Sequence, residues 1–542
     1  MNNTVLLLDN SDNVGVALMD LFPGNQVMLN GKTIEIQDFV AAKHKFAMRA
    51  FAPGEEIYMY GTTVGEATQA IPEGGAITLQ NIRHKTKKYQ VQTGGYSWNS
   101  PDTSSWQDQT FMGYKRSDNQ VGTANIWLVL PMVFCENTNV QLMQEAFENS
   151  LGLKKMNPYE RQIRTLISGL NGEKFTESVA QKTETFDSKI FPNLDGIRFL
   201  THSMGCGGTR QDAETLCALL AGYIHHPNVA GATVLSLGCQ NAEVRILQEK
   251  LQELGCTKPL VICDQQQSGT TEALLNRAIE ETFQQLVLAN QATRQPAPLS
   301  HLTIGLECGG SDGFSGISAN PTLGAVSDLI VALGGKAILS EFPELCGAEE
   351  NLIQRCESPE LAQKFIHLME TYNEAAKRVG SGFDMNPSPG NIKDGLLTDA
   401  IKSCGAAKKG GTAPVSDVLD YTEYATKPGL NLLCTPGNDV ESTTGLAGSG
   451  ANIILFTTGL GTPTGNPIVP VIKVSSNSKL VTKMPDIIDF DAGTIIEGLD
   501  TPQSAGDKLL KLIIEVASGK KKTKAEEKSN FDFIPWKRGV SL

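Results

Sequence analysis

Residues 301–344, HLTIGLECGGSDGFSGISANPTLGAVSDLIVALGGKAILSEFPE, constrain the fold of this chain more than any other stretch. The apolar run at 302–307 predicts a short strand that is buried on both faces. A helix is expected from Pro321, because proline suits the first helical position. The apolar side of this helix carries Leu323, Val326, Ile330 and Leu333. Gly334 and Gly335 end the helix before a second strand, so the stretch predicts part of a parallel sheet.

The loop between this strand and this helix is unusually polar. Its polar side chains include Cys308, Ser311, Asp312 and Asn320. Ligands bind at the carboxyl ends of the strands in open parallel sheets, so the loop is a candidate binding site. Glycine, serine, aspartate and asparagine are also ordinary loop formers, and this second interpretation stays open for the loop taken alone.

Length and charge limit the classes of function. A chain of 542 residues is too long for one hydrophobic core, so roughly two to four domains are expected. The formal net charge of −13 argues against a nucleic acid or an anionic membrane as partner, since both need a basic surface. No apolar run reaches the length of a membrane span, and the first residues lack a signal-peptide pattern, so a cytoplasmic protein is expected. The 11 cysteines include no CxxC pair, which predicts reduced thiols.

Three regions differ in their residue patterns. Residues 1–90 contain short alternating strands and Pro-Gly turns, which predict a small β-domain. In residues 110–290, apolar strands alternate with amphipathic helices, which predicts a parallel sheet with helices on both faces. Residues 300–542 resume this alternation and predict a second parallel-sheet α/β domain. The segments 88–109 and 290–300 are expected to be linkers, because they are polar and lack periodicity.

Cysteines recur at or just beyond the ends of apolar strand runs. They are Cys135, Cys206, Cys239 and Cys308. Free cysteine is usually a small buried hydrophobe, but four at one kind of position favour a role at the sheet edge. Cys206 is the strongest candidate, because it precedes a helix start that can stabilise an anion, and His202 is nearby. The stretches GCGGTR and GLGTPTGNP match neither GxGxxG nor a P-loop, so a nucleotide site is not supported.

Longer motifs are distributed along nearly the whole chain. They include HKFA at 44–47, LPMVFC at 130–135, THSMGCG at 201–207, LGCQN at 237–241, GLECGGSDGFSGISANPTLG at 305–324, NPSPGN at 386–391, PGND at 436–439 and TTGLGTPTG at 457–465. With these motifs the chain resembles the altronate and galactarate dehydratase family, lyases that remove water from sugar acids. PGND resembles the altronate branch more closely. The resemblance implies an α/β fold with a small N-terminal SAF or β-clip-like domain and two parallel-sheet α/β domains.

The resemblance implies a metal-assisted elimination that converts D-altronate to 2-dehydro-3-deoxy-D-gluconate and water in hexuronate catabolism. A base removes the proton beside the carboxylate, and the hydroxyl on the following carbon leaves. The enolate intermediate carries two negative charges, so a divalent ion and fixed positive groups are needed to stabilise it. Fe²⁺ is the expected cofactor and Mn²⁺ is its alternative. An iron–sulfur cluster on three or four of the cysteines is a less favoured variant.

The resemblance also implies the residues of the site. The expected catalytic residues are His44 as base, Lys45 as partner of the substrate carboxylate, and His202. The expected substrate-binding residues are Arg83, Ser311, Asp312, Asn320, Asn438 and Asp439. The expected metal ligands are His202, Cys206, Cys239 and Cys308. Because His44 and Lys45 belong to the small domain, this domain is expected to cover the sheet edge as a lid.

The chain departs from the family pattern at three positions. Lys43 stands where the family has Gly, Ala124 where it has Arg, and Asp9 where it has His. These departures indicate either an altered substrate or only local drift. A different substrate, such as galactarate or another 2-hydroxy acid including a sulfonated one, therefore stays open. A protein that binds a small anion without turnover is the alternative outside the enzymes. The density of His, Cys and Asp at strand ends favours an enzyme. A homo-oligomer is also left open.

Overall fold

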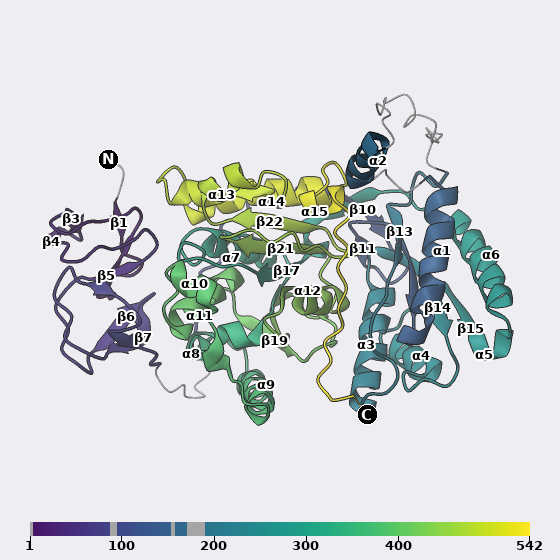
Figure 1. Cartoon of the computed structure of the whole chain (residues 1–542), viewed down its shortest axis with the longest axis horizontal. Coiled ribbons are helices and arrows are strands. Elements are labelled where there is room, and N and C mark those ends of the chain that lie inside the picture. Colours follow the sequence, from purple (N-terminus) through teal and green to yellow (C-terminus); the bar gives the residue numbers. More distant parts are fainter. Residues whose placement is uncertain (1–3, 87–94, 153–157, 171–189, 542) are drawn as a thin grey trace.

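The computed structural model describes residues 4–86, 95–152, 158–170 and 190–541. The small N-terminal domain lies at one end of the molecule, and the second domain, drawn in blue to teal, lies at the other (Figure 1). The C-terminal domain lies between them, although it comes last in the sequence. No helix within the described ranges combines the length and the apolar character that a membrane crossing requires.

The N-terminal domain is built from short antiparallel strands. One sheet has the order β1 (Val5–Leu6), β2 (Val14–Ala17), β5 (Lys45–Ala47) and β8 (Ala76–Ile77). The others are the hairpin β3 (Gln26–Leu29) and β4 (Lys32–Glu35), and the sheet β6 (Glu56–Met59), β7 (Thr62–Ala67) and β9 (Ile82–Arg83). Asn30 and Gly31 have φ of 49° and 75°, as a two-residue hairpin turn requires. The expected small β-domain is confirmed.

The second domain contains a sheet of four parallel strands. The sheet has the order β13 (Gly196–Phe199), β12 (Ile126–Pro131), β14 (Val229–Ser236) and β15 (Leu260–Asp264). Its helices are α1 (Asn137–Ser150), α2 (Pro158–Leu170), α3 (Arg210–His225), α4 (Val244–Glu253), α5 (Gln265–Ser268) and α6 (Thr271–Ala289). Buried residues of α1 and α6 share one core, and those of α3 and α4 share another, so helices cover both faces as expected.

The C-terminal domain contains a larger parallel sheet. Its seven strands have the order β19 (Val415–Leu419), β20 (Gly429–Leu433), β18 (Lys336–Leu339), β17 (Thr303–Cys308), β21 (Ile453–Thr458), β22 (Val471–Ser475) and β23 (Phe490–Asp491). Its helices are α7 (Ala319–Ala332), α8 (Glu349–Gln354), α9 (Pro359–Arg378), α10 (Pro389–Lys393), α11 (Asp399–Ala407), α12 (Asp439–Gly448), α13 (Ser478–Lys483), α14 (Pro502–Ala517) and α15 (Lys524–Glu527). The expected second parallel-sheet region is confirmed.

The strand order fixes where this sheet can bind a ligand. The chain leaves β17 toward β18 on one side of it and returns later to β21 on the other side. Neighbouring connections therefore diverge at the carboxyl ends of β17 and β21, which leaves a crevice at this topological switch point. The polar loop after β17 lies at this place.

The expected linkers contain ordered structure in their described parts, residues 95–109 and 290–300, whereas residues 88–94 lie outside the described residues. Residues 295–298 form β16 (Gln295–Pro298), which pairs with β10 (Thr110–Lys115) beside β11 (Val121–Gly122). Trp106 is buried, and its indole N–H donates to Asp507 of α14 at 3.2 Å. Helix α7 begins at Ala319, two residues before Pro321. Apolar contacts made by Trp106 and backbone pairing across 182 or more residues explain the order in the two linkers, because neither leaves a local periodicity in the sequence.

The second and C-terminal domains share a hydrophobic core. Helix α3 packs against α12, and a Cβ added to Gly222 of α3 would come within 2.1 Å of the carbonyl oxygen of Gly448. Beyond α15, the last residues of the chain return across this boundary. Arg538 pairs with Asp420 of the C-terminal domain, while the backbone N–H of Gly539 donates to Asp212 of α3. The two sheets are therefore held together by apolar and polar contacts.

Candidate functional site

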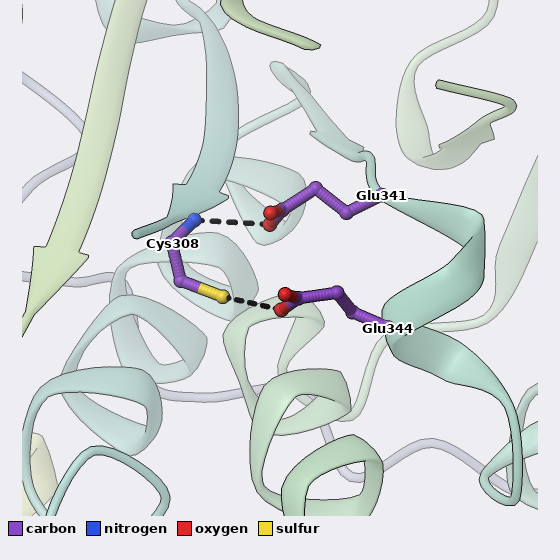
Figure 2. A group of neighbouring side chains, drawn as sticks. All are labelled: Cys308, Glu341 and Glu344. Atoms are coloured by element: carbon purple, nitrogen blue, oxygen red, sulfur yellow. Dashed lines mark hydrogen bonds between the residues drawn. The ribbon is translucent and has the colours of Figure 1, made fainter. Parts of the chain in front are cut away.

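A cluster of charged side chains is buried at the carboxyl edge of the C-terminal sheet. Cys308 ends β17. After β18, Glu341 lies just before the short helical turn Phe342–Leu345, and Glu344 lies within this turn. Ligand atoms of these three residues all lie within 4.8 Å of one another, and Figure 2 shows both carboxylates directed at Cys308. The backbone N–H of Cys308 donates to Glu341, and its thiol donates to Glu344, each at 3.0 Å.

Glu341 has an unusual backbone conformation. Its φ of 68° and ψ of 59° lie in the left-handed region, which costs a residue with a Cβ roughly 1–2 kcal/mol. The hydroxyl of Thr435, after β20, accepts the backbone N–H of Glu341 at 2.8 Å and helps to hold this conformation. Strained residues of this kind cluster at functional sites. Here the left-handed backbone conformation directs the carboxylate of Glu341 toward Cys308.

Two lysines balance the charge of these carboxylates. Lys409 donates to the sulfur of Cys308 at 2.7 Å and to Glu341 at 2.6 Å. Lys402 of α11 donates to Glu344 at 2.6 Å. Burial alone would lower the pKa of each lysine, but the neighbouring acidic groups reverse this effect and raise the pKa above its ordinary value. Both ammonium groups therefore stay charged at neutral pH.

The thiol of Cys308 and the carboxyl of Glu307 are held in their neutral forms. Burial raises the pKa of Cys308 well above its ordinary value, and Glu341 and Glu344 raise it further. Burial and Glu341 likewise raise the pKa of Glu307, whose Oε2 accepts from the hydroxyls of Ser340 and Ser442. Among the described residues, the second oxygens of Glu307 and Glu341 accept from no donor group, but the proton of the neutral Glu307 carboxyl can link these two side chains. A proton or a cation between these two oxygens would satisfy both.

The residues Cys308, Glu341 and Glu344 fit a divalent metal ion by their donor chemistry. One sulfur and two carboxylates converge, and the second oxygen of Glu341 can also bind the ion. Mixed sulfur and oxygen donors accept Fe²⁺, Mn²⁺ and Zn²⁺, so the set does not select one of them. Lys409 now makes the contacts to Cys308 and Glu341 that an ion would make, so its ammonium has to move when an ion binds.

The N-terminal domain reaches the same sheet edge through the loop before β5. The ammonium of Lys43 lies 2.9 Å from Asp312 and 2.9 Å from Asp394. Lys45 donates to the carbonyl oxygen of Gly395 at 2.6 Å, and burial lowers the pKa of Lys45 to about 7. The Nε2 of His44 lies 3.1 Å from the carbonyl oxygen of Lys393, which it can contact only as a donor.

This contact with Lys393 sets the protonation of the His44 ring. A carbonyl oxygen accepts, so Nε2 carries the proton and Nδ1 keeps its lone pair in the neutral ring. Burial lowers the pKa of His44, and the contact with Lys393 and the charge of Asp394 offset only part of that effect. His44 is therefore neutral at pH 7 and has a basic nitrogen.

Several expected substrate-binding residues have structural contacts in this region. Asp312 is fully buried and accepts from Ser315 and Ser476 as well as from the ammonium of Lys43. The carbonyl of Ser311 accepts from Asn391, and the side-chain oxygen of Asn320 accepts from Thr457. The side chain of Asn438 caps α12 by accepting from the backbone N–H groups of residues 440 and 441. These contacts shape the loop after β17 and the start of α12.

Asp439 lies beside the buried cluster. A Cβ added to Gly309 would come within 2.2 Å of its carboxylate, so the glycine lets Asp439 approach the loop after β17. Burial raises the pKa of Asp439 to about 7, and the charges of Glu341 and Glu344 contribute to this. Lys473 of β22 is also buried, which lowers its pKa to about 7.

The remaining expected site residues lie elsewhere. His202 is buried in the second domain, where its Nε2 donates to the carbonyl of Pro131 and its Nδ1 accepts the backbone N–H of Met204. Cys206 and Cys239 are exposed in the same domain, on a sheet that does not include Cys308. Arg83 is exposed in β9 and pairs with Glu66. The structure thus does not bring these four residues to the cluster around Cys308.

Sequence reasoning missed the acidic and basic partners of Cys308. Glu341 and Glu344 belong to the segment SEFPE that follows the expected second strand, so their position at a strand end was a usable signal. Lys402 and Lys409 lie about 100 residues beyond Cys308, on a helix and a turn that no motif marks. Their role depends on tertiary packing alone.

The pairing of Lys402 with Glu344 leads to a stability prediction. We expect Lys402→Met to lower the free energy of unfolding by about 3–5 kcal/mol, because it leaves the buried carboxylate of Glu344 unpaired. The double variant K402M/E344L removes both charges and is expected to be more stable than K402M. Denaturant unfolding midpoints measure the difference. Lys508→Met is the control, since Lys508 pairs with Asp500 and is 59% exposed, and should cost less than about 1 kcal/mol. A double variant no more stable than K402M would contradict the prediction.

Asp439 makes stability depend on pH. Its pKa is about 7 in the folded protein and 3.8 ordinarily, so the folded state retains a proton that the unfolded state has lost. The stabilisation is fully present below about pH 4 and is lost as pH rises through about 7. As pH rises from about 4 to about 7, we therefore expect the stability of Asp439→Asn to increase relative to that of the unmodified protein, because only the unmodified protein loses this stabilisation. Thermal midpoints measured at several pH values test this, and a constant difference between the two proteins would count against it.

Comparison with known proteins identifies relatives along the whole chain. Family models match for the altronate/galactarate dehydratase SAF domain at residues 3–85, for the D-galactarate dehydratase/altronate hydrolase second domain at 113–290, and for the D-galactarate/altronate dehydratase C-terminal domain at 299–541. The altronate dehydratases of Escherichia coli and Bacillus subtilis are each 34% identical over 98% of both chains. The L-threo-forming galactarate dehydratase of Escherichia coli is 29% identical over 91% of this chain and 89% of its own.

Proposed function

Because the chain belongs to the altronate/galactarate dehydratase family, we propose that it is a hydro-lyase that converts D-altronate to 2-dehydro-3-deoxy-D-gluconate and water. The observation that carries this proposal is the 34% identity to two altronate dehydratases over 98% of the chain. The identity to the galactarate dehydratase is lower, at 29%, which favours altronate as the substrate. The reaction breaks a C–H bond beside the carboxylate and a C–O bond on the next carbon.

The proposed site lies at the switch point of the C-terminal sheet, under the loop of residues 43–45. His44 is the proposed base, because Nδ1 of its neutral ring can take the proton beside the substrate carboxylate. Lys43 and Lys45 place amino groups at the same edge, where the charge of Lys43 offsets those of Asp312 and Asp394 that would repel a sugar acid. Asp312 positions Lys43 through their ion pair.

Negative charge that develops on the substrate needs a counter-charge. Lys409 and Lys402 are the buried cations beside the cluster, and their raised pKa values keep them charged. Cys308, Glu341 and Glu344 would hold the divalent ion proposed for this site, Fe²⁺ or Mn²⁺, which supplies Lewis-acid stabilisation of the enolate when it is bound. Asp439, with a pKa of about 7, is the proposed donor of a proton to the leaving hydroxyl.

Turnover of two sugar acids tests the proposed reaction. The protein is purified anaerobically, treated with chelator, and offered altronate and galactarate separately with Fe²⁺ or Mn²⁺. We expect a 2-keto-3-deoxy acid from altronate, with activity restored by the metal. Product from galactarate alone would retain the mechanism and correct the substrate. Binding of altronate without product by folded, metal-loaded protein would favour an anion-binding protein instead.

His44→Gln tests the proposed base. Loss of a general base typically lowers the rate by about 10²–10⁴-fold, so we expect kcat to fall by this factor while KM changes little. Circular dichroism and the thermal midpoint show whether the variant keeps its fold. His367→Gln is the matched control, because His367 is exposed on α9, and it should retain full activity. A near-normal kcat in His44→Gln would remove His44 from this role.

A further inference from the structure

The exposed cysteines of the described residues share one edge of the second domain. Of the free cysteines, Cys135, Cys206 and Cys239 are exposed, whereas the others are buried or half-buried. The three follow β12, β13 and β14, which are adjacent parallel strands in the order β13, β12, β14. Their thiols therefore come from three neighbouring loops at the carboxyl edge of one sheet, where functional groups of parallel sheets gather.

Backbone hydrogen bonds join these three loops. The N–H of Phe134, next to Cys135, donates to the carbonyl of Met204 at 3.1 Å. The N–H of Ala242, in the loop of Cys239, donates to the carbonyl of Gly205 at 3.1 Å. The loop that carries Cys206 is thus bonded to both of the others. The ring of His202 strengthens the first junction, because it contacts the backbone of Pro131 and of Met204.

Glycines allow the loops to approach closely. Gly205 and Gly207, on either side of Cys206, have φ of 103° and 68°, and Gly238, before Cys239, has φ of 115°. A Cβ added to Gly205 would come within 2.3 Å of the carbonyl oxygen of Met132. These left-handed conformations favour glycine and leave two of the cysteines on sharply turned backbone.

The three cysteines offer sulfur atoms as metal ligands. The side-chain amide of Gln266 donates to the sulfur of Cys239 at 3.2 Å, a type of hydrogen bond that tunes metal-bound sulfur. Thiolate donors select zinc, Cu(I) or iron–sulfur clusters. Among the residues that the structure describes, Cys308, Glu341 and Glu344 are the group whose ligand atoms converge within 4.8 Å, so the three exposed sulfurs are spread more widely. A multi-iron cluster spans a wider set of sulfurs than a single zinc ion with bonds of about 2.3 Å.

We propose that Cys135, Cys206 and Cys239 are the protein ligands of an iron–sulfur cluster at the edge of the second domain. This centre is separate from the residues around Cys308 and does not rest on the proposed dehydration. In a four-iron cluster, three thiolates leave one iron without a protein ligand. Because the three cysteines are exposed, that iron would be accessible from solvent to a small molecule with an oxygen ligand.

Anaerobic reconstitution of the full chain with ferrous iron and sulfide tests this assignment. Bound iron, acid-labile sulfide and the broad visible absorption of an iron–sulfur chromophore are measured together. We expect all three signals in the unmodified protein and their loss in C135S, C206S and C239S. C256S is the matched control, since Cys256 is half-buried in the same domain, and it should keep the signals.

The same measurements can overturn the proposal. Equal iron and sulfide in the unmodified protein and the variant with all three serines would exclude these cysteines as ligands. Metal bound by the three cysteines without sulfide would exclude a cluster. Iron that remains without sulfide in the triple variant, and is lost in E341Q/E344Q, belongs to the other proposed site. Circular dichroism shows that each variant keeps its fold, so a loss of signal reports on ligation.

Discussion

The cluster in the C-terminal domain depends on the pairing of buried lysines with buried carboxylates. An isolated charge in a protein interior costs several kcal/mol, so Glu341 and Glu344 can be ionised there only because Lys409 and Lys402 contact them. Burial and the same two carboxylates raise the pKa of Cys308 and keep its thiol neutral, although both lysines act in the opposite direction. The balance of charge determines what can bind at this site more than any single metal ligand does. The two lysines already neutralise the two carboxylates, so an incoming ion or substrate has to displace some of these ion pairs.

Much of this fold could be predicted from periodicity. The apolar strands and amphipathic helices predicted the parallel sheets, and the loop after β17 was expected to carry Cys308 and Asp312 at a sheet edge. Local patterns suffice there, because burial on both faces of a strand leaves an apolar run in the sequence. The same reasoning could not separate the two sheets, and it therefore grouped Cys206 and Cys239 with Cys308.

The parts that were missed depend on tertiary structure. Lys402 lies on a helix whose every residue is buried, and nothing in its sequence distinguishes it from a surface lysine. His202 was a reasonable ligand by residue type, but both of its ring nitrogens contact backbone groups. Whether a polar side chain is free for a ligand depends on which partners the fold brings to it. Residue type and spacing do not contain that information.

The contact between the N-terminal and C-terminal domains explains one departure from the family pattern. Lys43 has a φ of 77°, a conformation that favours the glycine of the family pattern and costs lysine roughly 1–2 kcal/mol. Gly395 lets this loop lie close, because a Cβ there would come within 2.5 Å of the carbonyl oxygen of Lys43. The ammonium of Lys43 gains two carboxylate partners, Asp312 and Asp394, which offset the strain. In this chain the ammonium of Lys43 therefore joins the two domains, whereas a glycine at this position would leave Asp312 and Asp394 without this cation. The edge of the C-terminal sheet that faces a sugar acid is less negative as a result.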